Sequence, residues 1–248
     1  MTSILALHHV GVRFGDHMAL VDVDVAIGPG ERVALVGPSG AGKTTFLRLA
    51  DRSVTPTSGT VATFGADRVP TGAADARAAC RRVGTVHQHL HLVGPLRVVH
   101  NVNAGHLGRW TRRRALWSLV RPREVDAARA ALDRLGIADK LGERTDRLSG
   151  GEQQRVALAR LLVQDPELVL ADEPVASLDP ARAEEVMDLL CDVVAGRTRT
   201  LVVSLHDFDL ARRRCDRLIG LRAGRVVFDA PAADVTDAMG HALYRIDR

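Results

Sequence analysis

The eight residues GPSGAGKT, Gly37–Thr44, lie between the apolar run VALV, Val33–Val36, and the helix-forming segment TFLRLA, Thr45–Ala50. They fit the pattern G-x-x-x-x-G-K-[ST], a loop that joins a strand to a helix and wraps backbone N–H groups around phosphate oxygens. In this pattern the lysine adds a positive charge and the threonine hydroxyl binds Mg²⁺. A chance glycine turn does not explain the strand and the helix on either side. The stretch predicts a nucleoside triphosphate site formed by Gly37, Pro38, Ser39, Gly40, Ala41, Gly42, Lys43, Thr44 and Thr45.

Short apolar runs elsewhere predict an α/β core. Leu168–Ala171 and Leu201–Val203 are continuous apolar segments, which are typical of parallel strands covered by helices on both faces. Ala181–Val194 has apolar residues at helical spacing after an Asp-Pro pair, a typical helix start. We therefore expect a helix that joins two parallel strands.

The two ends of the chain differ from this core. Over Val21–Ile27 apolar residues alternate with Asp and Ala, the period of two expected for an antiparallel strand with one buried face. Two apolar runs within Leu218–Phe228 flank a short Arg-Ala-Gly segment and predict a closing hairpin.

The middle of the chain, residues 89–164, has little strand character. It contains helix-like segments such as Glu124–Leu135 and an arginine cluster at Arg109–Arg114. The cluster could face a membrane protein or anionic lipid, or it could form a solvated helix face, and we assign it no site role. We expect one domain over residues 1–248: a P-loop NTPase α/β fold with a parallel-sheet core, an N-terminal antiparallel β subdomain and a helical subdomain inserted at about 89–164.

Composition fits one large domain. The chain has 248 residues, of which 46% are hydrophobic, and a net charge of +4, which alone indicates no particular partner. No segment reaches the roughly 18 consecutive apolar residues of a membrane span, and Met1–Val10 lacks the regions of a signal peptide. Cys80, Cys191 and Cys215 lack the paired spacing of a zinc site or disulfide framework. We expect a cytoplasmic chain with reduced cysteines.

Two acidic residues, Asp172 and Glu173, directly follow the apolar run Leu168–Ala171. Ligands of open α/β sheets collect at the carboxyl ends of the strands, where two adjacent carboxylates are costly without a cation. We expect Asp172 to bind Mg²⁺ through water, and Glu173 to orient or deprotonate the water that attacks the γ-phosphate. Asp-Glu-Pro alone is also common as a capping turn, but the phosphate loop favours the catalytic interpretation.

The sequence LSGGEQ, Leu148–Gln153, precedes a long helical segment, Gln154–Val163. Ser149 and the amides after it would lie at a helix N-terminus, which favours anions. Spacing supports a plainer alternative, because Ser149 and Glu152 make a capping box of the kind found in ordinary helices. The residues alone leave both interpretations open.

Leu148–Gln153 resembles the signature of the ABC (ATP-binding cassette) family, and further motifs of that family match in order. Gln88 resembles the Q-loop glutamine and Ser177–Asp179 the D-loop. His206 resembles the switch histidine and Phe14 the aromatic residue that stacks on adenine. Each has an ordinary structural explanation when taken alone, so their joint order carries the resemblance.

The resemblance implies the ABC ATPase fold, ATP and Mg²⁺ as ligands, and hydrolysis of ATP to ADP and phosphate. It also implies an ATP-sandwiched homodimer in which the signature of one subunit completes the site of the other. The implied catalytic residues are Glu173, His206 and Gln88, and the implied metal ligands are Thr44, Gln88 and Asp172. Further implied nucleotide contacts are Phe14, Ser149, Gly150, Gly151, Gln153 and Asp179.

Three stretches resemble the ATP-binding subunits of phosphonate importers: Leu92–Gly108, the segment around Trp110 and Trp117, and ADEPVASLDP, Ala171–Pro180. The resemblance implies a peripheral protein at the cytoplasmic face of the cell membrane that energises phosphonate uptake through integral permease subunits. A periplasmic or lipid-anchored substrate-binding protein would be an indirect partner, and no nucleic acid is expected.

Other functions stay open at this point. The nucleotide chemistry would be the same if the cargo were phosphate, an amino acid or an exported lipid. A DNA-repair ABC ATPase would split the core with a long coiled coil, and the sequence has no sustained heptads. A P-loop kinase would need an acceptor site and a lid, but not the Ser149 motif or His206.

Overall fold

The computed structural model describes the chain except for residues 1–2, 66–77, 79–80, 177, 196–198 and 246–248. The chain forms two compact units, unit 1 from Met1–Val69 and Leu168–Arg248, and unit 2 from Pro70–Glu167. Cys80 and Ser177 lie outside the described residues. A single domain with an insertion at about 89–164 stays a prediction.

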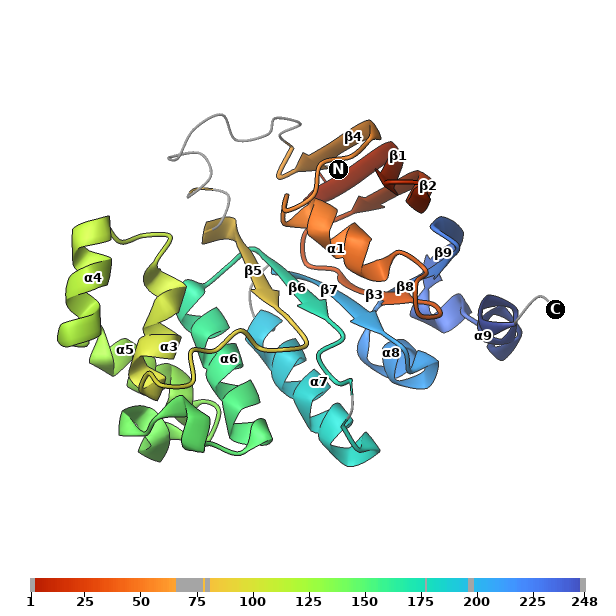
Figure 1. Cartoon of the computed structure of the whole chain (residues 1–248). Coiled ribbons are helices and arrows are strands. Elements are labelled where there is room, and N and C mark those ends of the chain that lie inside the picture. Colours follow the sequence, from red (N-terminus) through yellow and green to blue (C-terminus); the bar gives the residue numbers. More distant parts are fainter. Residues whose placement is uncertain (1–2, 66–77, 79–80, 177, 196–198, 246–248) are drawn as a thin grey trace. The chain divides into compact units, whose positions relative to one another are not determined.

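Unit 1 contains a mostly parallel sheet built from the apolar runs (Figure 1). Its strands lie in the order β6 (Leu168–Asp172), β7 (Thr200–Leu205), β3 (Arg32–Val36), β8 (Arg217–Arg222) and β9 (Arg225–Pro231). The first four are parallel, and β9 returns antiparallel to β8, so the predicted hairpin is confirmed. Every residue of β7 is buried, as expected of a parallel strand inside an α/β core.

A second sheet of unit 1 is antiparallel. Its strand order is β2 (His17–Ile27), β1 (Leu5–Phe14) and β4 (Ser58–Thr63). Along the second half of β2, buried and exposed residues alternate, with Val23, Val25 and Ile27 inside. This confirms the N-terminal antiparallel sheet that was predicted from the alternation of apolar and polar residues.

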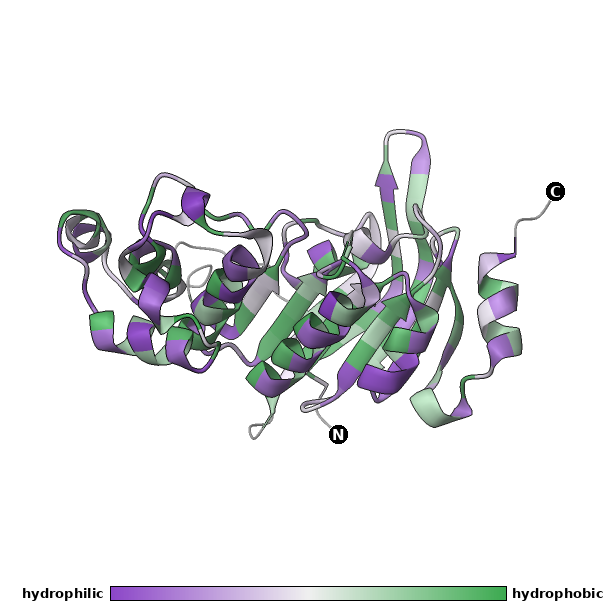
Figure 2. Cartoon of the chain, turned by 90° about the horizontal axis from the view of Figure 1, so that it is seen from below, coloured by the Kyte–Doolittle hydropathy of each residue, from purple (hydrophilic) through white to green (hydrophobic). Residues whose placement is uncertain are grey.

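The helices of unit 1 follow its strands. Helices α1 (Lys43–Ala50), α7 (Pro180–Val194) and α8 (Phe208–Arg214) come after β3, β6 and β7, and α9 (Asp237–Tyr244) comes after β9 and the 3₁₀ turn Ala232–Asp234. Figure 2 shows that the helices carry both hydrophilic and hydrophobic residues, whereas the central strands are mainly hydrophobic. The predicted helix between β6 and β7 is α7. It begins where the Asp179 side chain accepts the N–H of Arg182 at 3.1 Å and Pro180 occupies the first turn.

Unit 2 is mainly helical. Its elements are β5 (Val83–Val86), α3 (Val98–Asn103), α4 (Arg112–Val120), α5 (Val125–Asp133) and α6 (Gly150–Gln164), with short 3₁₀ turns at Ala104–His106, Ala138–Gly142 and Thr145–Arg147. Buried Asn101 joins two segments of this unit, because its amide donates to Thr145 Oγ1 at 2.9 Å and to the carbonyl of Val93 at 3.0 Å. Helices α3 to α6 agree with the helical character predicted for this stretch.

Among the residues that the structure describes, no helix combines the length and the apolar character needed to cross a bilayer.

Cys191 and Cys215 are free thiols, and burial raises the pKa of Cys215 to about 12. A thiol with that pKa is a poor nucleophile, which agrees with a structural role.

We predict that Phe46→Ala lowers the free energy of unfolding by about 3–5 kcal/mol, because Phe46 on α1 is fully buried and its truncation leaves a cavity. Phe14→Ala is the matched control. Phe14 is 48% exposed, so its loss should cost less than about 1 kcal/mol. Urea denaturation without nucleotide gives both values, and equal losses would contradict this assignment of the core.

Candidate functional site

The predicted phosphate loop, Gly37–Thr44, joins β3 to α1, as its motif requires. Gly37, Gly40 and Gly42 have positive φ angles of 149°, 77° and 105°. A Cβ atom on Gly37 would lie 2.0 Å from the carbonyl oxygen of Leu221, so this position accepts only glycine. A Cβ atom on Gly40 would meet nothing within 4 Å, so the loop is open to a ligand on that side.

The ammonium group of Lys43 is held inside this loop. Its side chain is 3% exposed, and Nζ donates to the carbonyl oxygens of Gly37 at 2.8 Å and Pro38 at 3.1 Å. Burial lowers the pKa of Lys43, while the nearby carboxylates of Glu173 and Asp172 raise it. A buried cation with mainly neutral partners favours an anionic ligand at the loop.

A serine that no sequence motif indicates links the carboxylate of Asp172 to the backbone of Glu173. Ser204 lies on β7 with 0% exposure, and its hydroxyl donates to Asp172 Oδ1 at 2.8 Å. The same hydroxyl accepts the backbone N–H of Glu173 at 2.8 Å. Thr44 of the phosphate loop donates to the same Asp172 oxygen at 3.2 Å. One hydrogen-bonded cluster therefore contains residues from three separate segments of unit 1.

Glu173 also contacts the predicted switch histidine. The Oε1 atom of Glu173 lies 2.6 Å from Nε2 of His206 and 4.0 Å from Nζ of Lys43. The backbone of Glu173 has a φ of 48°, a left-handed conformation that costs roughly 1–3 kcal/mol and that the bond from its N–H to Ser204 helps to hold. A cavity of about 290 Å³ beside this pair leaves room for water.

Tyr244 is a second residue that no sequence motif indicated. It ends α9, and its hydroxyl accepts the N–H of Gly37 at 3.2 Å and donates to the carbonyl oxygen of His206 at 3.0 Å. Burial raises the pKa of Tyr244, which favours the protonated, hydrogen-bond-donating form. One side chain thus connects the phosphate loop with the residue that contacts Glu173.

Two other predicted residues of unit 1 lie on its surface. Phe14 is the last residue of β1 and is half exposed, as a stacking platform must be. Asp179 is exposed, and its side chain caps α7. Their predicted roles toward a nucleotide stay predictions.

The remaining predicted residues belong to unit 2. Gln88 is exposed in a turn after β5. Ser149 caps α6 in a full capping box, in which its hydroxyl accepts the N–H of Glu152 at 3.3 Å and its own N–H donates to Glu152 Oε2 at 2.8 Å. Gln153 donates to the carbonyl of Leu148 at 3.1 Å. Cβ atoms built on Gly150 and Gly151 would meet nothing within 4 Å, so this helix end is capped and also open to a ligand.

Comparison with known sequences gives consistent matches. Residues 20–176 match the family described as ABC transporter. Phosphonates import ATP-binding protein PhnC of Anaeromyxobacter dehalogenans is 52% identical over 232 residues, which cover 94% of this chain and 46% of that protein, less than half its length. Phosphonates import ATP-binding protein PhnC 2 of Pseudomonas aeruginosa is 47% identical over 226 residues, which cover 91% of this chain and 85% of the relative.

Solved structures agree with these matches. The structure of CbiO1 from Clostridium perfringens, part of the ABC transporter complex CbiONQ, has a TM-score of 0.81 and 25% identity, covering 98% of this chain and 93% of that one. A dimeric ATP-binding cassette in a post-hydrolysis state, bound to ADP and Pi, has a TM-score of 0.73 and 28% identity, covering 92% and 98%. The predicted ABC ATPase fold is thereby confirmed. The chain belongs to the ABC transporter family, within the group of the phosphonates import ATP-binding proteins.

Proposed function

We propose that this chain is the ATP-hydrolysing subunit of an ABC importer and that it energises phosphonate uptake through a separate membrane permease. The observation that carries the ATPase proposal is the cluster in which Thr44 of the phosphate loop donates to Asp172 and the neighbouring Glu173 lies 2.6 Å from His206. The names of the relatives support the cargo.

We propose that Thr44 and Asp172 hold Mg²⁺; the expected role of Gln88 as a metal ligand stays a prediction. Hydroxyl, carboxylate and amide oxygens are the hard donors that Mg²⁺ prefers. The hydroxyl of Thr44 and Oδ1 of Asp172 are already 3.2 Å apart, and Ser204 fixes the orientation of the carboxylate. When bound, Mg²⁺ would neutralise charge on the phosphate groups of ATP.

Each residue of the site in unit 1 then has its own role in binding or hydrolysing ATP. The backbone of Gly37–Thr44 and Thr45 surrounds the phosphates, Lys43 supplies charge, and Phe14 stacks on adenine. Glu173 orients a water molecule and accepts its proton as the water oxygen bonds to the γ-phosphorus and the bond to the ADP oxygen breaks. His206 holds the carboxylate of Glu173 in place through the 2.6 Å contact.

We further propose that residues 1–248 act as one ATP-binding domain whose helical subdomain carries the signature. Ser149, Gly150, Gly151 and Gln153, together with Asp179, would contact the ATP held by a second copy of the chain. A helix N-terminus with open glycines is suited to a γ-phosphate. Because ATP would contact both copies, its hydrolysis would release them, and this cycle would drive a permease and its substrate-binding protein from the cytoplasmic face.

The cargo is tested with the subunit reconstituted in lipid with its co-purified permease and substrate-binding protein. We expect phosphonates to stimulate ATP hydrolysis, and phosphate or amino acids to leave the basal rate unchanged. If phosphate or an amino acid stimulates hydrolysis instead, the assignment as an ATPase stands and the assignment of phosphonates as the cargo is refuted.

Glu173→Gln should bind ATP, lose most of its turnover and accumulate as a dimer, because the γ-phosphate that joins the two copies is no longer removed. Light scattering after size exclusion with ATP, together with phosphate release, measures both effects. Glu185→Gln, at an exposed position of α7, is the matched control. Normal hydrolysis by Glu173→Gln would contradict the assigned role.

Ser204→Ala should lower kcat about tenfold and raise the Mg²⁺ concentration needed for half-maximal activity, because Asp172 and the Glu173 amide each lose a hydrogen bond worth roughly 1 kcal/mol. Ser204→Thr keeps the hydroxyl and should restore the Mg²⁺ dependence. If Ser204→Ala changes only thermal stability, with kcat and the Mg²⁺ dependence intact, Ser204 has no positioning role.

A further inference from the structure

Helix α4 of unit 2 presents large apolar side chains to solvent. Exposed fractions are 68% for Leu116, 62% for Trp117, 52% for Leu119 and 82% for Val120. All of α4 is described, and Ser118 is its only buried residue. Figures 1 and 2 both show α4 at the margin of its unit. Spacings of three and four residues place Leu116, Leu119 and Val120 on one face, with Trp117 beside it.

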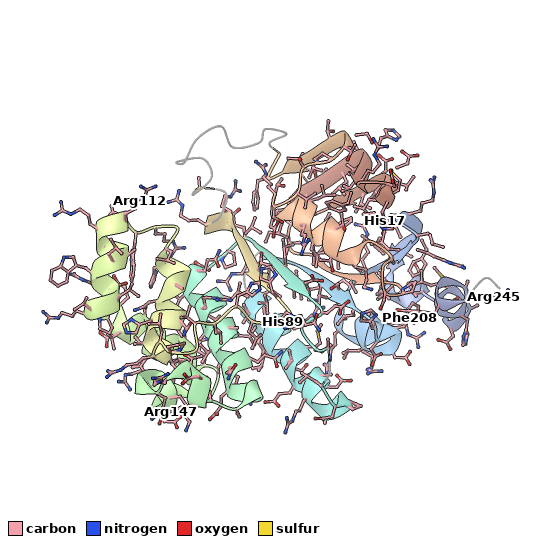
Figure 3. All side chains as sticks on the ribbon, in the orientation of Figure 1. His17, His89, Arg112, Arg147, Phe208 and Arg245 are labelled. Atoms are coloured by element: carbon pink, nitrogen blue, oxygen red, sulfur yellow. The ribbon has the colours of Figure 1, made fainter. Side chains whose placement is uncertain are left out.

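Arginines border this apolar face at both ends. Arg112 and Arg113 lie in the first turn of α4, and Arg121 and Arg123 follow its last residue; Figure 3 marks Arg112 at the N-terminal end. None of the four forms an ion pair with a described residue. Arg114 differs, because its guanidinium lies 5.2 Å from the ring centroid of Trp110 and pairs with Glu124. We call the exposed set the α4 patch: Arg112, Arg113, Leu116, Trp117, Leu119, Val120, Arg121 and Arg123.

The charge of the α4 patch discriminates between a permease and an anionic lipid bilayer as its partner. From Leu107 to Arg123 the sequence has six arginines and no Asp or Glu. The cytoplasmic loops of membrane proteins carry an excess of Lys and Arg, so a permease offers such a surface little charge complementarity. The cytoplasmic leaflet carries anionic lipids, which attract arginine. Trp117 also favours a lipid bilayer as the partner, because tryptophan is enriched at the membrane–water interface.

We propose that the α4 patch binds the headgroup region of an anionic bilayer directly, without the permease. The nine residues of α4 would lie in the membrane plane, with Leu116, Leu119 and Val120 below the headgroups and Trp117 at their level. The flanking arginines would pair with lipid phosphates. The proposal rests on the proposed function only for placing the chain at the cytoplasmic face.

Co-sedimentation of the purified subunit alone with vesicles tests whether the arginines of the α4 patch bind anionic lipid. We expect binding to phosphatidylcholine vesicles containing phosphatidylglycerol, and little to phosphatidylcholine alone. The triple variant Arg112→Gln, Arg113→Gln, Arg121→Gln should lower the partition coefficient about a hundredfold, or about fivefold for each arginine. The matched control, Arg129→Gln, Arg134→Gln, Arg225→Gln, removes the same charge from exposed positions outside the patch and should bind nearly as wild type does.

Lipids brominated along the acyl chain test whether the apolar side chains of the α4 patch enter the bilayer. The chain has two tryptophans, and Trp110 is only 7% exposed, so quenching on vesicle binding should come from Trp117 and should be absent in Trp117→Phe. Absence of wild-type binding at physiological salt, or equal loss of binding in both triple variants, would overturn the proposal. So would lipid-free binding to solubilised permease that the patch substitutions abolish. ATP hydrolysis by the reconstituted complex is a separate readout, so failure of the proposed function is distinguishable.

Discussion

Enclosing the ammonium group of Lys43 is the constraint on which the rest of unit 1 depends. A cation that is 3% exposed needs oxygen partners, and the loop that carries it supplies the carbonyls of Gly37 and Pro38. The loop can turn these carbonyls inward only because Gly37 and Gly42 adopt conformations that other residues avoid. Strand β3 and helix α1 hold the two ends of the loop. The positive charge remains available to a phosphate because its contacts within the loop are neutral.

The parallel register gathers the other reacting groups at the same place. Val36 pairs with Leu205, and Asp172 pairs with Ser204, so β3, β6 and β7 end at one edge of the sheet. Residues more than 120 positions apart, such as Thr44 and Asp172, therefore meet through a single hydrogen bond. The left-handed backbone of Glu173 is tolerable there because Ser204 accepts its N–H.

Sequence patterns predicted the parts of the fold that depend on local chemistry. The phosphate loop, the apolar runs and the Asp-Glu pair are short, and each has steric or electrostatic requirements that few other structures satisfy. Ser204 and Tyr244 were missed because their roles come from contacts 31 to 207 positions away in the chain. The arginines of α4 were visible in the sequence, whereas the exposure of Leu116 and Val120 beside them depends on packing. The predicted role of Ser149 involves a second copy of the chain, which no single-chain pattern can establish.

The bridge made by Tyr244 has a spectroscopic consequence. The chain contains one tyrosine, and its hydroxyl joins the Gly37 amide to the His206 carbonyl. A ring-fluorinated or isotope-labelled tyrosine would thus give a single resonance, free of assignment ambiguity, from the point where the phosphate loop meets the strand end of His206. Nucleotide turnover could then be followed at that point in the folded chain without changing any residue of its sequence.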